Sequence, residues 1–191
     1  MNTDSPIKIL FLTADPSDAS RLRLQQEYRD IEERLQLARQ RDRFELKPRL
    51  SARVGDITQA IFDIEPQIVH FSGHGTSTGA LCFENVLGKT QPVEPSALAA
   101  TFKLFADQVN CVLLNACYSE EQAKAIAEHI PFVIGMKQAI GDQAAIAFAV
   151  GFYKALGAGR SIEQAYEFGC AEIQLQGIPE HLTPVPYVKK K

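Results

Sequence analysis

The sequence has no long apolar run and no large excess of charge of one sign. Its longest apolar stretches are strand-sized, as in Val109 to Ala116, and none approaches the roughly 20 residues that a bilayer span needs. Its first residues lack the basic and apolar regions of a signal peptide, which predicts a cytoplasmic protein with no membrane contact. A net charge of −3 gives no general attraction to nucleic acid.

Paired cysteine motifs are also missing. The four cysteines contain no CxxC pair, which argues against a zinc ribbon or a dithiol redox site and favours free thiols. No set of His, Cys, Asp and Glu has the spacing of metal ligands, so we predict no metal and no cofactor. Three of the cysteines read as packed thiols; they are Cys82, Cys111 and Cys170.

What the sequence does have is the composition of an ordinary globular domain, with 46% hydrophobic residues in 191. Short apolar runs alternate with segments of helical periodicity. The strands are expected at 9–13, 44–50, 67–71, 80–83, 109–114 and 131–135. The helices are expected at 18–40, 56–65, 95–107, 120–130, 142–156 and 161–175. This alternation predicts one α/β domain with a largely parallel sheet, its core at about 7–176 and a tail at 177–191.

The expected helix at 18–40 has a narrow apolar face. Leu24, Tyr28, Ile31 and Leu35 are spaced by four, three and four residues, which places them on one side. Its remaining Gln, Glu and Arg residues are typical of a solvated surface.

Ligands and catalytic groups of open α/β sheets gather at the carboxyl ends of the strands. His74 lies there, between two glycines directly after the strand at 67–71, where small neighbours leave an imidazole accessible. The neighbouring His70 lies within that strand and is expected to be a packed core residue. His74 is therefore the candidate acid–base group.

Cys117 follows the strand at 109–114 and precedes a helix. A thiolate at such a junction is favoured by the helix N-terminus and by a nearby imidazolium. Alone, a buried structural cysteine would be the better reading. With His74 at the end of what should be a neighbouring strand, we predict that Cys117 is a nucleophile.

The strands ending in Ser72-Gly73-His74-Gly75 and in Asn115-Ala116-Cys117 resemble those of the caspase-like cysteine peptidases, and in particular of the bacterial CHAT domain. The segments at 9–16, 22–33, 133–142 and 148–156 extend this resemblance over about residues 7–176. It implies a caspase-like three-layer α/β/α sandwich with a mostly parallel central sheet. It also implies a cysteine endopeptidase with a His74–Cys117 dyad, whose oxyanion is held by the N–H groups of Gly75 and Cys117.

The resemblance also bears on which substrates are cut. Family members that cut after Arg or Lys line the S1 pocket with acidic groups. Asp15, after the first strand, matches the position of one such group, and Asp142, after the strand at 131–135, is a second candidate. Asn115 stands where metacaspases have an acid and is a weaker polar match. Helix or loop capping is the alternative role of both aspartates. The basic S1 pocket of caspases, which reads aspartate, cannot be carried over because the stretch around Cys117 is Asn-Ala-Cys-Tyr-Ser. The expected substrate is a protein or peptide with a basic P1 residue.

Between Cys117 and Pro131 there are 13 residues, mostly helical, which leaves no room for a cleavable linker. The spacing therefore favours control by a partner or by an allosteric loop movement over activation by processing. The family resemblance implies that the partner is a sensor or adaptor protein, in a bacterial defence or signalling system. The oligomeric state is left open. One alternative is a catalytically silent caspase-like interaction module. Another is a nucleotide or phosphate binder that uses the loop 75–79, but that loop lacks the lysine and helix of a P-loop.

Overall fold

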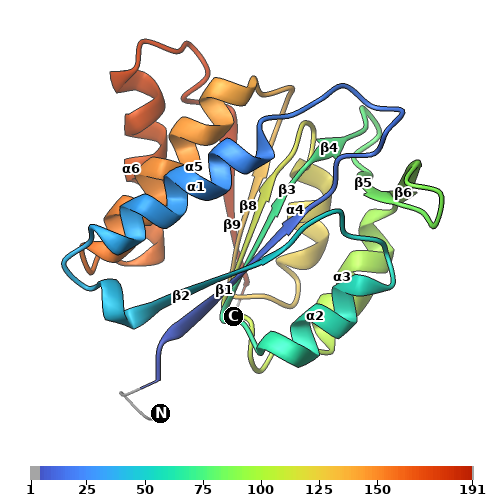
Figure 1. The fold of residues 1–191 in the computed structure, drawn as a ribbon, viewed down its shortest axis with the longest axis horizontal. Helices are drawn as coiled ribbons and strands as arrows, with labels where there is room; N and C mark the ends of the chain where they lie inside the picture. Colours follow the sequence, from blue (N-terminus) through green and yellow to red (C-terminus); the bar gives the residue numbers. More distant parts are fainter. Residues whose placement is uncertain (1–4, 191) are drawn as a thin grey trace.

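The computed structural model describes residues 5–190 and is built around a six-stranded sheet of order β2-β1-β3-β7-β8-β9 (Figure 1). Five of these strands are parallel, and β9 runs antiparallel to β8. The strands of this sheet are β1 (Ile7–Thr13), β2 (Phe44–Arg49), β3 (Ile68–Ser72), β7 (Cys111–Asn115), β8 (Phe132–Met136) and β9 (Pro184–Val188). A second, antiparallel sheet contains β4 (His74–Gly75), β5 (Leu81–Glu84) and β6 (Thr90–Val93).

Helices cover both faces of the main sheet, which gives the three-layer α/β/α sandwich expected from the sequence (Figure 1). One face carries α1 (Leu24–Gln36), α5 (Asp142–Gly157) and α6 (Ile162–Leu175). The other carries α2 (Asp56–Ile64), α3 (Pro95–Lys103) and α4 (Glu120–Ile126). A short 3₁₀ turn at Arg41–Arg43 precedes β2.

The central strands are apolar on both sides because both sides are covered. In β7, Cys111 and Leu113 join the core under α1, α5 and α6, whereas Val112 and Leu114 join the core under the other three helices. Burying one such side chain stabilises the fold by about 1.5–3 kcal/mol. The uniformly apolar runs in the sequence are thus the central strands of the sheet.

The structure differs from the sequence expectation at both ends of the chain. The first helix starts at Leu24 rather than Asp18, because the residues before it form a loop tied to the small sheet. There the Asp18 carboxylate accepts hydrogen bonds from the Thr90 N–H and hydroxyl, both at 2.9 Å. These bonds lower the pKa of Asp18, and they take the place of a helical turn.

Residues 184–188, which the sequence analysis assigned to a tail, instead form β9 at the edge of the main sheet. Pro184 and Pro186 lie two residues apart in this strand, so both face the same way. An edge strand tolerates prolines because alternate N–H groups point away from its single partner. No described helix has both the length and the apolar character to cross a bilayer.

A buried hydroxyl ties the ends of two central strands together. The Ser119 side chain is fully buried; it donates to the Leu114 carbonyl at 3.0 Å and accepts from the Met136 N–H at 2.9 Å. It therefore fixes the start of the loop after β7 against the end of β8.

We predict that Ser119→Ala lowers the free energy of unfolding by about 1–3 kcal/mol, because the Met136 N–H is left buried without a partner. Urea denaturation measures this change. Ser96→Ala, in the exposed part of α3, is the matched control and should cost less than about 0.5 kcal/mol. Equal losses in both variants would contradict the role of the Ser119 hydroxyl.

Candidate active site

The two candidate catalytic residues follow neighbouring strands. β3 and β7 are parallel and adjacent, and the last residues of the two strands, Ser72 and Asn115, are register partners. His74 and Cys117 each lie two residues beyond these partners. The adjacency predicted from the sequence is therefore present in the fold.

A close main-chain contact holds these two loops together. A Cβ atom placed on Gly75 would lie 1.9 Å from the carbonyl oxygen of Cys117 and 3.5 Å from its nitrogen. Only glycine permits this approach. His74 and Gly75 also pair with Cys82 and Leu81 of β5, so the small sheet holds the histidine loop from its other side.

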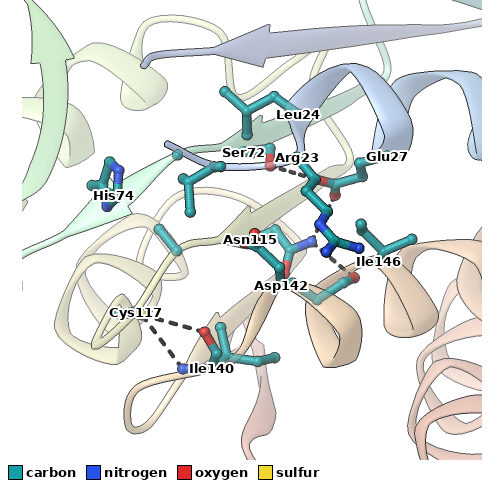
Figure 2. Close-up of a pocket in the computed structure, with 14 residues that line it drawn as sticks. Arg23, Leu24, Glu27, Ser72, His74, Asn115, Cys117, Ile140, Asp142 and Ile146 are labelled. Atoms are coloured by element: carbon teal, nitrogen blue, oxygen red, sulfur yellow. Dashed lines mark hydrogen bonds between the residues drawn. The ribbon is translucent and has the colours of Figure 1, made fainter. Parts of the chain in front are cut away.

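The reactive atoms of the two residues are hydrogen-bonded elsewhere in this structure. His74 Nε2 lies 2.7 Å from the Ser20 carbonyl oxygen. Cys117 Sγ donates to the Ile140 carbonyl at 3.6 Å and accepts from the Ile140 N–H at 3.4 Å (Figure 2). The loop before α1 thus engages the imidazole, and the loop before α5 engages the thiol.

The backbone directly after the thiol is strained. Tyr118 has a φ of 55°, in the left-handed region that side chains other than glycine rarely adopt. Such a residue costs of order 1 kcal/mol and persists only where its surroundings impose it. Here the Tyr118 N–H donates to the Gln138 carbonyl at 3.2 Å, and this bond holds the turn that presents Cys117.

The other three thiols lack an activating environment, and two of them, Cys82 and Cys111, are also buried. Cys111 is completely buried, and burial raises its pKa far above the ordinary value of a thiol. Burial also raises the pKa of Cys82 and of Cys170. Of the four cysteines, Cys117 is the one that lines the same cavity as His74.

That cavity, of about 40 Å³, opens between the start of α1, the ends of β3 and β7, and the start of α5. Figure 2 shows the side chains around it. Those with polar groups are Arg23, Glu27, Ser72, His74, Asn115, Cys117 and Asp142. The cavity therefore joins the candidate dyad to two carboxylates and an amide.

Of the three residues expected to bind the P1 side chain, two line this cavity. They are Asn115, at the end of β7, and Asp142, the first residue of α5. Asp15 instead lines a neighbouring hollow, where its Oδ2 accepts from Arg21 Nη1 at 2.7 Å. The structure thus brings Asn115 and Asp142 to the dyad and leaves Asp15 outside the cavity.

Glu27 is a cavity residue that the sequence analysis placed on a solvated helix face. Its side chain is buried, with 2% of the residue exposed. The carboxylate accepts from Ser72 Oγ and from Asn115 Nδ2, the latter at 2.7 Å, and Oε1 lies 3.0 Å from His70 Nε2. Its sequence signal was its position between Leu24 and Ile31, on the buried side of the helix.

The core histidine belongs to the same network. His70 is completely buried, as expected, and its Nδ1 lies 3.1 Å from the Tyr153 hydroxyl. Its contact with Glu27 is close, but it is not aligned as a hydrogen bond. Among the described residues, no three His, Cys, Asp or Glu side chains converge to hold a metal ion.

Comparison with solved structures shows the class of fold. Caspase-1 from Spodoptera frugiperda superposes with a TM-score of 0.61 at 13% identity, over 96% of this chain and 86% of the caspase. Its pro-form gives a TM-score of 0.60 at 14% identity, over 97% of this chain and 92% of the pro-form. The chain has the caspase-like fold.

The family is shown by sequence. The model of the CHAT domain matches residues 2–168, and the chain belongs to the CHAT domain family. A "Probable protease" of Gillisia limnaea is 29% identical over 150 residues, which are 78% of this chain and 26% of that protein. A "Roc-COR-CHAT protease" of an unknown prokaryotic organism is 27% identical over 184 residues, 93% of this chain and 17% of that protein. The chain thus spans about a quarter or less of these curated relatives.

The contact between the two loops leads to a prediction for Gly75→Ala. The added methyl group would overlap the Cys117 carbonyl, so the variant should lose about 1–3 kcal/mol of stability. The two loops should also separate, which crystallography or amide chemical shifts of residues 73–76 and 116–119 would detect.

Gly55→Ala is the matched control, because a Cβ there meets no atom within 4 Å. It should change the stability by less than about 1 kcal/mol. A Gly75→Ala protein as stable as this control, with unshifted loop resonances, would contradict the close contact.

Proposed function

We propose that this chain is a cysteine endopeptidase with His74 and Cys117 as its dyad. The observation that carries the proposal is that β3 and β7 are adjacent and bring the two loops into main-chain contact at Gly75. The CHAT family model and two relatives named as proteases support it.

The mechanism uses the dyad and the main chain beside it. His74 takes the proton of the Cys117 thiol, and the sulfur attacks the carbonyl carbon of the scissile peptide bond. The N–H groups of Gly75 and Cys117 stabilise the oxyanion, and one such donor lowers the barrier by about 3 kcal/mol. His74 then gives its proton to the leaving amine. Water hydrolyses the thioester, which returns the thiol.

The proposed P1 residue is Arg or Lys. Asp142 and Asn115 line the cavity next to Cys117 and supply hydrogen-bond acceptors for a cationic side chain. Asp15 remains a second-rank candidate, since its carboxylate faces Arg21 outside that cavity. It would reach a P1 side chain only after the loop before α1 has moved.

The activity is proposed to be under the control of a sensor or adaptor protein, in a bacterial defence or signalling system. The bonds of His74 to Ser20 and of Cys117 to Ile140 keep the two reactive atoms engaged elsewhere, which fits an enzyme that waits for a signal. A partner that moves the loop before α1 would free the imidazole. The chain covers 26% and 17% of the length of the two curated relatives, one of which is named a Roc-COR-CHAT protease.

The same bonds favour the second candidate function, a caspase-like interaction module without catalysis. On that reading the His74–Ser20 bond is permanent, and Cys117→Ala leaves the function of the protein unchanged.

A fluorogenic peptide library scanned at P1 tests the proposal, with Cys117→Ala as the control. We expect turnover after Arg or Lys in the wild type and a loss of at least about 10³-fold in the variant, because the nucleophile is gone. Cys117-dependent turnover after another residue would retain the dyad and overturn the basic P1 preference.

If no Cys117-dependent turnover is found, a second experiment is needed. A peptidase whose His74 and Cys117 stay bonded to Ser20 and Ile140 would also show no turnover. Ser20→Pro alters the loop whose carbonyl faces His74, and it should raise the turnover if that loop restrains the imidazole. Silence in this variant as well would favour the interaction module.

A further inference from the structure

Glu27 is a buried carboxylate that lacks a strong cationic partner. Its hydrogen-bond donors, Ser72 and Asn115, are both neutral, and its one ion-pair contact is with the poorly aligned imidazole of His70. Burying a carboxylate is costly unless a charge or several hydrogen bonds compensate it. The side of this group that faces the cavity is therefore suited to a positive charge.

Asn115, which binds Glu27, carries an unsatisfied acceptor. Its Nδ2 donates to Glu27 Oε1 at 2.7 Å and to the Ala145 carbonyl at 3.0 Å. Two acceptors around one atom identify it as the nitrogen and so fix the orientation of the amide. The Oδ1 atom has no hydrogen-bond partner, and water cannot readily supply one because only 3% of the residue is exposed. A ligand with an N–H donor would satisfy it.

The shape of the cavity fits a small cationic group. A volume of about 40 Å³ holds a few atoms, which is the size of an ammonium or guanidinium group at the end of a side chain. Arg23 also lines this cavity, and its side chain extends between Glu27 and Asp142 in Figure 2. Arg23 is exposed, and none of the ion pairs of the described residues includes it. Its side chain would have to swing into solvent for a cationic ligand to approach Glu27.

We infer that Glu27 and the side-chain oxygen of Asn115 determine the specificity of this cavity. Together they select a substrate residue with a cationic side chain. As an account of peptide cleavage this inference rests on the proposed function. The recognition of the cation itself does not, because it depends on residues other than Cys117. In this arrangement α1 contributes directly to substrate choice.

The test is a titration of the full chain with three matched probes, followed by amide chemical shifts. The probes are n-butylguanidine for arginine, n-butylamine for lysine and the neutral n-butylurea. The wild type should bind the two cations more tightly than the urea. The comparison of the two cations shows which head group the cavity prefers.

The decisive variant is Glu27→Gln, which keeps the size of the side chain and one of its two acceptor oxygens. It should weaken cation binding by about 10-fold or more and leave urea binding unchanged, because the negative charge is removed while the shape of the side chain is kept. Glu33→Gln is the matched control, since Glu33 is an exposed residue of the same helix. It should change cation binding by less than about twofold, as expected for a screened surface charge.

Equal cation binding by the wild type and Glu27→Gln, or no preference of the wild type for cations over the urea, would overturn the inference. If Glu27→Gln does not give a folded spectrum, Asn115→Ala takes its place. That variant should also weaken cation binding, and an unchanged affinity would overturn the inference.

The proposed function fails separately. Cation binding that depends on Glu27, in a protein without Cys117-dependent turnover in either peptide arm, would support the cavity and reject the peptidase. Turnover after a basic P1 residue that depends on Cys117 but not on Glu27 would support the peptidase and reject the role of Glu27.

Discussion

The candidate site depends on the main-chain contact between Gly75 and Cys117. β3 and β7 are adjacent, so the loops after them begin side by side. A side chain at position 75 would overlap the Cys117 carbonyl oxygen, and glycine therefore lets the peptide groups of the two loops touch. The small sheet supports the first loop through β5, and Ser119 anchors the second between β7 and β8.

The buried network around Glu27 connects this contact to the helical layer. Glu27 belongs to α1, Ser72 ends β3 and Asn115 ends β7, so a single carboxylate joins three elements at the point where the two loops begin. His70 and Tyr153 extend the network into the core beneath α5. A network that includes a buried charge is costly unless it is satisfied. Two of its buried atoms, Asn115 Oδ1 and His70 Nε2, have no hydrogen-bond partner, and of these two residues Asn115 lines the cavity.

Much of this arrangement could be predicted from the sequence, because it follows from periodicity and topology. The apolar run before Asn115 predicts a central strand, and parallel strands place their following loops at one edge of the sheet, which brings His74 to Cys117. The burial of Glu27 could not be predicted, because Glu27 and Tyr28 are neighbours in the sequence. Either of them completes nearly the same helix face with Leu24 and Ile31. Only the polar partners on β3 and β7 show which of the two residues is enclosed.

Long-range contacts explain the other differences. The first helix starts late because Asp18 and Ser20 bond to Thr90 and His74, which are distant in the sequence. The prolines at 184 and 186 favoured a tail over a strand in the sequence, although an edge strand such as β9 accommodates them. In both places the structure depends on a segment that is distant in the sequence, namely the small sheet and its loop for residues 18–20 and β8 for β9.

The central claim, that Cys117 is a nucleophile activated by His74, is tested most directly by covalent trapping with a peptidyl-arginine acyloxymethyl ketone. Peptide mass mapping identifies the modified thiol. The account predicts a thioether at Cys117, with Cys82, Cys111 and Cys170 unmodified, and modification slowed by at least about 10²-fold in His74→Ala. Modification of all accessible thiols at similar rates, unaffected by His74→Ala, would contradict it.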